Sequence, residues 1–283
     1  MHNSPYFLYL QLLKKYKERS VFMLFKSPHF RFNGKSSRDF QLRICEVGNG
    51  SEMHSFGVER TANVETTTSM VTRLKDFSYN NSSFEITLVK TDGYQILPFT
   101  KDERFEIIQW LFQDGFKPFI SEDDESKIYY AVFTAGSRYY NGLDQGYLNL
   151  TVQLNAPCAF SPVLTHFYQV EGTQLIELEN KTNVEPFTYP DIEFWLNGET
   201  TDLMIENLTT GDVMSFSNLR KETHLYCYNE GMKQLQCVND PTYNARPSFN
   251  NKWIKLAQGR NLLRITSPHA HVKLISQTKL ALD

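Results

Sequence analysis

The chain has 283 residues and a formal net charge of -3. This length suits two domains, because single domains usually hold about 100–200 residues. Hydrophobic residues make up 41% of the chain, which is enough for ordinary cores and excludes a wholly disordered protein. The weak negative charge provides no basic face for a phosphate backbone, so the composition also excludes a typical nucleic-acid binder.

Aromatic residues are abundant, at 14% of the chain with 21 Phe and 15 Tyr. Aromatic side chains suit the half-buried surface of a sheet and are enriched at contact surfaces, so the composition favours β-structure and interfaces. The cysteines are few and form no close pair, which indicates a reduced, intracellular assembly compartment. They are Cys45, Cys158, Cys227 and Cys237.

Residues 1–22 are predicted to be an N-terminal extension of the fold. The apolar run Tyr6–Leu13 precedes its basic residues, which is the reverse of a signal peptide, and it is too short for a bilayer span of about 20 residues. Met23 is a second possible start. We therefore expect a soluble protein with no membrane segment.

From Phe40 onward the dominant pattern is the two-residue period of half-buried strands. It is strongest in Gly146–Leu154 and returns in Ser83–Leu88 and Asp191–Leu196. Further strand-like runs are Lys127–Thr134, Asp202–Asn207, Thr223–Tyr228, Trp253–Ala257, Leu262–Thr266 and Val272–Ser276. Turn signals separate them at Asn33-Gly34, Asn197-Gly198, Thr210–Asp212, Asn229–Gly231 and Gly259–Asn261. Short strands at this spacing predict a sandwich or barrel.

One segment has the helical period. Thr100 and Glu103 form a capping-box pattern, which predicts a helix over 101–114 that Gly115 closes in a left-handed conformation. The apolar positions recur at helical spacing, so they should be buried against the first group of strands, while Lys101, Glu106 and Gln113 stay wetter. These positions are Phe105, Ile108, Leu111 and Phe112.

A domain boundary is predicted at Ala156–Pro162, where two prolines bracket small residues after a strong strand. The fold class is mainly β. The first domain, 23–161, is expected to be barrel-like or sandwich-like with one helix, and the second, 162–283, to be a β-sandwich.

Three groups of residues are candidates for chemistry, and each has a structural interpretation that we favour. Glu122–Glu125 is an acidic run that reads as a solvated loop, because a hydrolase needs two carboxylates that converge from separate elements. His269 and His271 could share a metal if they lie on one strand, but further ligands at zinc spacing are missing and Ser267-Pro268 suggests a turn. Cys227 and Cys237 are predicted to be cross-strand neighbours, as buried thiols or as a disulfide.

Common catalytic and nucleotide-binding motifs are missing from the sequence: it contains no Gly-x-Ser-x-Gly, no P-loop and no Gly-x-Gly-x-x-Gly. We therefore predict no catalytic residues, no cofactor-binding residues and no metal ligands, and we expect that the protein is not an enzyme.

Read from Met23, the chain resembles the distal tail proteins of siphophages. Met23–Gly34 is similar to the opening strand and turn of that family, and Arg104–Leu111 occupies the place of its single helix. Lys127–Val132 and Gly146–Pro162 resemble the end of its first domain. In the second half, Ile205–Gly211 and Leu256–Asn261 fit the turns "I-x-N-x-x-T-G" and "L-x-x-G-x-N" of its galectin-like domain. Residues 1–22 have no counterpart, and the second domain carries no inserted carbohydrate-binding module.

The resemblance implies a structural protein of the virion that assembles in the host cytoplasm. Its first domain would form a homo-oligomeric, hexameric ring with a central channel through which DNA passes. The ring would join the tail tube protein and the tape measure protein to the tail-tip or tail-associated protein. The second domain would anchor receptor-binding or baseplate proteins.

Two other functions stay open at this point. A carbohydrate-binding sandwich would use an exposed aromatic face, and Trp195, which points away from the side of Phe194, is its candidate residue. A glycoside hydrolase is less favoured, since no separated carboxylate pair stands out.

Overall fold

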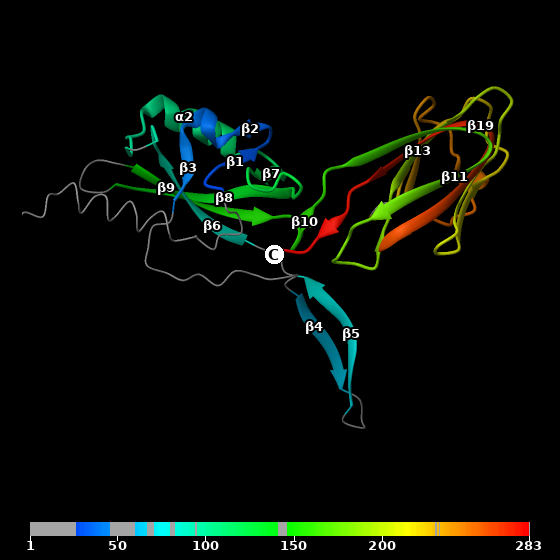
Figure 1. Cartoon of the computed structure of the whole chain (residues 1–283), viewed down its shortest axis with the longest axis horizontal. Coiled ribbons are helices and arrows are strands. Elements are labelled where there is room, and N and C mark those ends of the chain that lie inside the picture. Colours follow the sequence, from blue (N-terminus) through cyan, green and yellow to red (C-terminus); the bar gives the residue numbers. More distant parts are fainter. Residues whose placement is uncertain are drawn as a thin grey trace, which may run out of the picture. The chain divides into compact units, whose positions relative to one another are not determined.

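The computed structural model describes residues 27–45, 60–66, 71–79, 83–93, 95–140, 146–229, 231 and 233–282. The chain divides into two compact units, one of residues 1–157 with 282–283 and one of residues 158–281 (Figure 1). The division falls within Ala156–Pro162. The expected extension at residues 1–22 lies outside the described residues. No helix in the described part of the chain has the length and apolar character to cross a membrane.

The first unit is built on a seven-stranded antiparallel sheet (Figure 1). Its strands follow the order β2-β1-β7-β8-β9-β6-β3. Their bounds are β1 Phe30–Phe32, β2 Lys35–Ser36, β3 Leu42–Ile44, β6 Ser83–Lys90, β7 Lys117–Ser121, β8 Tyr129–Tyr140 and β9 Gly146–Leu154. A short 3-10 helix, η1 Ser37–Phe40, follows β2.

The alternating sequences of β9 and β6 become strands with one buried face. In β9 the buried residues alternate with half-buried ones along the whole strand, as predicted. In β6, Ile86 and Leu88 are buried. The structure extends the expected strand Lys127–Thr134 to Tyr140, with a bulge between Phe133 and Ala135.

Aromatic rings fill the space between this sheet and the helix. Phe30 stacks on Phe119 and on Trp110, with ring centroids 4.8 and 5.6 Å apart. Phe32 meets Phe133 edge-on at 5.0 Å. The Trp110 indole Nε1–H donates to the Phe32 carbonyl oxygen at 2.8 Å, which satisfies the polar atom of a buried Trp. The high aromatic content therefore forms the core of this unit.

The α-helix of the described chain, α2 Lys101–Leu111, begins as predicted. Thr100 Oγ1 accepts from the backbone N–H of Glu103, and the Glu103 carboxylate accepts from the backbone N–H of Thr100. The helix ends at Leu111, three residues before the predicted end at Asp114. Gln113 leaves the helix, and its side chain bonds the Gln109 carbonyl and Asn33. Gly115 is left-handed, at φ +75°, but it lies beyond the helix end.

The predicted buried stripe of this helix is wrong at three of its four positions. Phe105, Ile108 and Phe112 are 61%, 55% and 41% exposed, and of the predicted stripe only Leu111 is buried. The helix instead buries Ile107 and Trp110 beside Leu111. A neighbouring apolar stripe at the same spacing is therefore the one that packs, because it carries Trp110, whose large ring buries the most area. The other stripe is left exposed.

A separate two-stranded hairpin is formed by β4 Arg60–Thr66 and β5 Thr72–Tyr79. Val64 pairs with Leu74 across the hairpin, and these two residues are 57% and 54% exposed. Directly opposite residues of an antiparallel pair lie on one face. The hairpin therefore presents an apolar face that it does not cover itself.

The second unit is all β, and it is organised by one long ribbon of two strands (Figure 1). Strands β11 Leu164–Asn180 and β19 Gly259–Ser276 pair along their whole length. On its other side, β19 pairs with β14 through residues 263–266 and with β13 through residues 270–275. Gly172, at φ +81°, lies at the bulge that bends β11 between these two regions, and a residue with a Cβ would be strained there.

The remaining strands flank this ribbon in the order β15-β14-β19-β13-β16-β17. Their bounds are β13 Asp191–Leu196, β14 Leu203–Asn207, β15 Asp212–Phe216, β16 His224–Tyr228 and β17 Gln234–Cys237. Two short pairs complete the unit, β10 Ala159–Phe160 with β20 Lys279–Leu280 and β12 Phe187–Thr188 with β18 Leu256–Ala257. Its core includes Phe194, Phe216 and Ile192, all fully buried.

Several predicted boundaries in this unit are wrong. Strand β19 runs through Gly259–Asn261 and Ser267-Pro268, which were expected to be turns. Pairing with β11 continues across Gly259–Asn261, whereas at Pro268 it shifts register between Ser267 and Ala270 and then resumes. Of the expected strand Trp253–Ala257, only Leu256–Ala257 is a strand. The expected strands Leu262–Thr266 and Val272–Ser276 are parts of β19.

Candidate functional site

Two of the surface hollows among the described residues are considered as candidate sites, one in each unit. The first, which we call the helix groove, lies between the exposed stripe of α2 and strands β8 and β9, and has a volume of about 520 Å³. Its apolar lining includes the exposed Phe105, Ile108 and Phe112 and the buried Ile107, Leu111, Leu148 and Leu150, and Lys101, Arg104 and Arg138 also line it. The groove exists because α2 buries only one of its two apolar stripes.

Gly136 on β8 keeps this groove open. A Cβ added at Gly136 would lie 3.0 Å from Leu150 Cδ2 and 3.2 Å from Phe112 Cζ, which is tighter than ordinary contact. The residue therefore allows the Phe112 ring to lie close to the sheet. The groove joins apolar area to flanking positive charge, a combination suited to contact with a protein partner.

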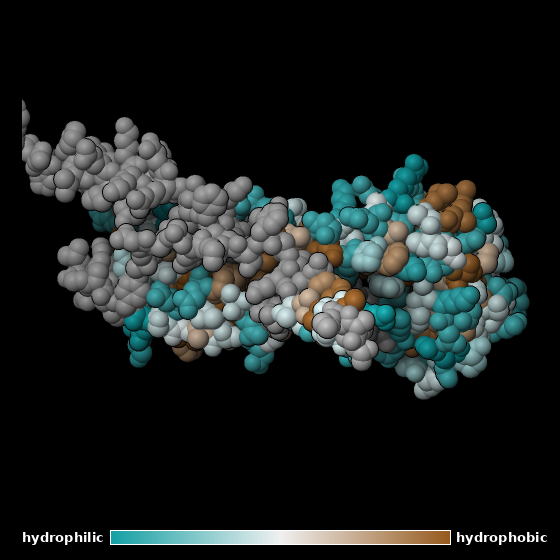
Figure 2. Space-filling model, turned by 90° about the horizontal axis from the view of Figure 1, so that it is seen from below, coloured by the Kyte–Doolittle hydropathy of each residue, from teal (hydrophilic) through white to brown (hydrophobic). Residues whose placement is uncertain are grey.

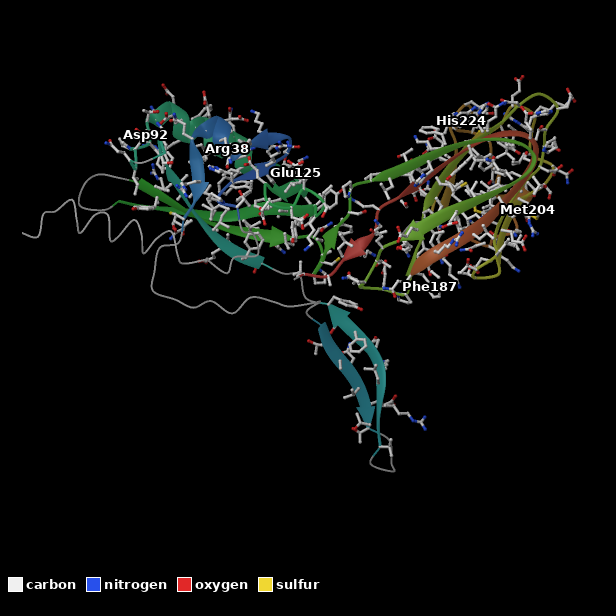
Figure 3. The ribbon with its side chains drawn as sticks, viewed as in Figure 1. Arg38, Asp92, Glu125, Phe187, Met204 and His224 are labelled. Atoms are coloured by element: carbon white, nitrogen blue, oxygen red, sulfur yellow. The ribbon has the colours of Figure 1, made fainter. Side chains whose placement is uncertain are left out.

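The second hollow, which we call the Trp195 hollow, lies on the outer face of the sheet β17-β16-β13-β19 and also measures about 520 Å³. Trp195 stands between two histidines of the neighbouring strands: its ring is 5.2 Å from that of His271, nearly parallel, and 5.4 Å from that of His224. Phe167, from β11, is 65% exposed at the other side of the hollow. His224 is labelled in Figure 3.

Glu193 connects the charged side chains of this hollow. The His224 Nε2–H donates to Glu193 Oε1, and Lys273 Nζ donates to Glu193 Oε2, each at 2.9 Å. Partial burial alone would raise the pKa of Glu193, but the hydrogen bonds from Lys273 and His224 hold that pKa below its usual value. The carboxylate is thus ionised and balanced at neutral pH.

The candidate catalytic and metal residues are not brought together by the fold. His269 and His271 both lie on β19, contrary to the expected turn, and His271 packs on Trp195. Within the described ranges, no three His, Cys, Asp or Glu side chains gather as a metal site requires. Cys227 and Cys237 lie on paired strands, but Cys227 faces Leu235 and Cys237 faces Leu225, and both are buried free thiols.

The acidic run Glu122–Glu125 is a loop, as expected, but it also ties the first unit together. Glu122 accepts from Arg38 Nε at 2.7 Å and from Ser36 at 2.9 Å. Glu125 pairs with Arg31 at 3.4 Å. Arg38 and Glu125 are labelled in Figure 3. These carboxylates bind the β1–η1 region and do not converge on a shared cleft.

The sequence patterns did not predict the helix groove or most of the Trp195 hollow. Of the hollow's residues they indicated Trp195, but not Glu193, His224 or Lys273. The register explains the omission: Trp195 lies opposite His224 and His271, and Glu193 lies opposite Lys273, on strands about 30 and 80 residues apart in the sequence. Only the pairing reveals these neighbours.

The fold and these surfaces define a two-unit β-protein with a single α-helix among its described residues and an uncovered apolar groove. Comparison with known families gives the assignment. Residues 25–156 match the family described as a phage tail protein N-terminal domain, and residues 158–276 match the family described as a phage tail C-terminal domain. The chain therefore belongs to the phage tail proteins that these two domains define. No curated protein matches the sequence.

One solved structure shares the fold of this chain. The crystal structure of the SPP1 Dit (gp 19.1) protein, described as a paradigm of the hub adsorption apparatus in phages that infect Gram-positive bacteria, matches with a TM-score of 0.61 and 14% identity. The match covers 88% of this chain and 98% of that chain. The phage P2 baseplate in its activated conformation with Ca matches with a TM-score of 0.47 and 9% identity, over 89% of this chain and 97% of that chain. The resemblance to siphophage distal tail proteins is confirmed, and the chain has a Dit-like fold.

Proposed function

We propose that the protein is the hub of a phage tail tip, a subunit of a closed ring that is most simply hexameric. The ring joins the tail tube and tape measure proteins to the tail-associated and receptor-binding or baseplate proteins. DNA passes through its channel. The protein has a structural role and no catalytic one. Membership of the phage tail family and the fold of a hub protein support this proposal.

The helix groove is the observation that best supports ring formation. A monomer would leave Phe105, Ile108 and Phe112 in water, and large exposed apolar patches usually mark contact sites. Ring closure needs two different patches that meet, since a head-to-tail interface is heterologous. The apolar face of the β4–β5 hairpin, which includes Val64 and Leu74, is the second patch. We infer that the hairpin of one copy contacts the groove of the next.

The net charge of the chain is consistent with the proposed DNA channel. A formal net charge of -3 gives the ring no overall attraction to a polyanion, so DNA can slide through it. The second unit remains available for the receptor-binding or baseplate proteins. We keep the expectation that this unit is galectin-like, and the expected domain limits 23–161 and 162–283, as parts of the proposal.

A matched pair of substitutions on α2 tests the interface. Ile108→Glu places a carboxylate in the groove, and Gln109→Glu places the same charge one residue further along, at an exposed position that does not line the groove. We expect native mass spectrometry and negative-stain images to show rings for the wild type and for Gln109→Glu, and single chains for Ile108→Glu. Rings of undiminished yield for Ile108→Glu would contradict the role of the groove.

A further inference from the structure

The Trp195 hollow has the parts of a small-molecule site, and it is separate from the helix groove and the hairpin face through which the ring is proposed to close. It lies wholly within the second unit and has a volume of about 520 Å³, in the range of about 300–1,000 Å³ for ligand sites. Aromatic rings flank a small number of polar groups, as such sites require. Figure 2 shows apolar patches among hydrophilic residues on the surface of this unit.

The charges in the hollow indicate which ligands it can take. Glu193 is balanced by Lys273 and His224, and Glu222 adds an exposed carboxylate at the rim. The site therefore has no excess of positive charge with which to hold a phosphate or a carboxylate. It offers instead acceptors on Glu193 and Glu222, donors on Lys273, and the amide side chain of Asn197 at the rim. This mixed set of groups suits a neutral ligand that both donates and accepts hydrogen bonds.

The aromatic residues provide the complementary apolar surface. Phe167 is 65% exposed, and the Lys273 ammonium lies 5.5 Å from the centre of its ring, which positions the ring beside the charged cluster. The Trp195 ring packs nearly parallel to the His271 ring and edge-on to the His224 ring, and Trp195 lines the hollow together with Phe167. A flat group with one apolar face can therefore lie against Phe167 and over Trp195.

We propose that the Trp195 hollow binds one sugar ring of a neutral saccharide. The C–H face of a pyranose packs against Phe167 and Trp195, and its hydroxyl groups bond Glu193, Lys273 and Asn197. A carboxylate has about four lone-pair sites, so Glu193 can accept a hydroxyl while it keeps its bonds to His224 and Lys273. The site is a property of the second unit and does not depend on the ring.

Binding can be measured on the full-length protein by saturation-transfer NMR. The probes are the methyl glycosides of glucose, galactose, mannose and N-acetylglucosamine, with glycerol 1-phosphate as the anionic comparison. We expect at least one glycoside to receive saturation at about 10 mM, with no competition from glycerol phosphate. No signal from any glycoside, or binding of glycerol phosphate alone, would overturn the proposal.

A matched pair on strand β11 places the binding at the hollow. Phe167 and Leu175 are 65% and 58% exposed on the same strand, but only Phe167 lines the hollow. Phe167→Ala should weaken glycoside binding by about tenfold or more, and Leu175→Ala by less than about twofold. Because both side chains are exposed, neither change should unfold the protein. Equal glycoside binding by the two variants would refute the assignment of the site. This outcome does not depend on whether the protein forms rings.

Discussion

Lys90, at the end of β6, and Glu103, in the first turn of α2, form an ion pair with 2.6 Å between Nζ and Oε1. The Lys90 side chain is only 11% exposed, so Glu103 replaces contacts with water that this ammonium group has lost. The same carboxylate bonds the backbone N–H of Thr100 through Oε2 at 2.9 Å. One glutamate thus caps the helix and attaches it to the sheet, and this attachment helps to fix which stripe of α2 faces the groove.

Replacing that glutamate should remove a pH dependence of stability. Hydrogen bonds from Lys90 and from Thr100 lower the pKa of Glu103 below its usual value. Its contribution is therefore complete above the unfolded pKa of about 4.3 and is lost as the pH falls through the folded pKa. Glu103→Gln should cost about 1–2 kcal/mol at pH 7. Urea unfolding at several pH values checks this: the difference from the wild type should shrink below about pH 4, and a constant difference would contradict the role of the charge.

Two adjacent isoleucines test which face of α2 is buried. Ile107 is 4% exposed and Ile108 is 55% exposed. Ile107→Ala and Leu111→Ala should each cost about 2–5 kcal/mol, the range for truncating a buried side chain. Ile108→Ala and Glu106→Ala should stay within about 0.5 kcal/mol in single chains. Hydrogen exchange of the α2 amides in urea, measured below the concentration at which rings form, reports these values. A larger loss for Ile108→Ala than for Ile107→Ala would reverse the assignment.

The helix cap gives a smaller effect. Thr100→Ala removes the acceptor for the backbone N–H of Glu103 and should cost about 0.5–2 kcal/mol. Thr100→Ser keeps the hydroxyl group and should restore most of the loss. The same exchange measurement applies, and equal losses for the two variants would show that the cap does not act through the hydroxyl group.

Four buried asparagines fix the segment Ile254–Ala257 in the second unit. Asn180, Asn207 and Asn229 donate to the carbonyl oxygens of Leu256, Lys255 and Ile254, at 2.9, 2.7 and 2.6 Å. Asn261 bonds both the backbone N–H and the carbonyl of Ala257 and also accepts from Asn207. Asn207 and Asn261, which belong to the two sequence patterns that resemble the family's turns, therefore hold a segment of which only Leu256–Ala257 is a strand.

Removing one of these asparagines should destabilise the second unit. Asn261→Ala leaves several buried polar groups without partners and should cost about 1–3 kcal/mol. Asn250→Ala is the control, because Asn250 makes a similar bond to the Val213 carbonyl at 2.8 Å but is exposed to water. The control should lose less than about 1 kcal/mol. Denaturant unfolding followed by Trp fluorescence measures both, and equal losses would rule out burial as the cause.

The elements predicted well are those whose signal is local. The alternation of β9 and the capping box of α2 are each complete within a few residues, so the sequence alone indicated them. Which of the two apolar stripes of α2 is buried could not be predicted from nearby residues. It depends on the aromatic cluster around Trp110, whose other rings, Phe30 and Phe40, are distant in the sequence. Strand β11 was missed altogether. Its burial does alternate, but the apolar residues Phe167 and Leu175 stand at exposed positions, while His166 and Gln174 stand at partly buried ones, so polar and apolar residues do not alternate cleanly in the sequence.

The candidate sites show the same division. Trp195 could be named from the sequence because its strand alternates clearly. Its partners His224, Lys273 and Phe167 come from three other strands, and only the register of the sheet places them. Pro268 suggested a turn because proline often ends a strand, but it lies in β19 where the pairing passes from β14 to β13.

The most direct test of the proposed function is the mass of the full-length protein in solution. Light scattering coupled to size exclusion, at about tens of micromolar, distinguishes a ring from a single chain. Six copies of a 33.0 kDa chain should elute as one species with six times the mass of the chain, and negative-stain images should show a closed ring. A single species of 33.0 kDa at every concentration, with no ring in the images, would contradict the proposal that this phage tail protein is a ring-forming hub.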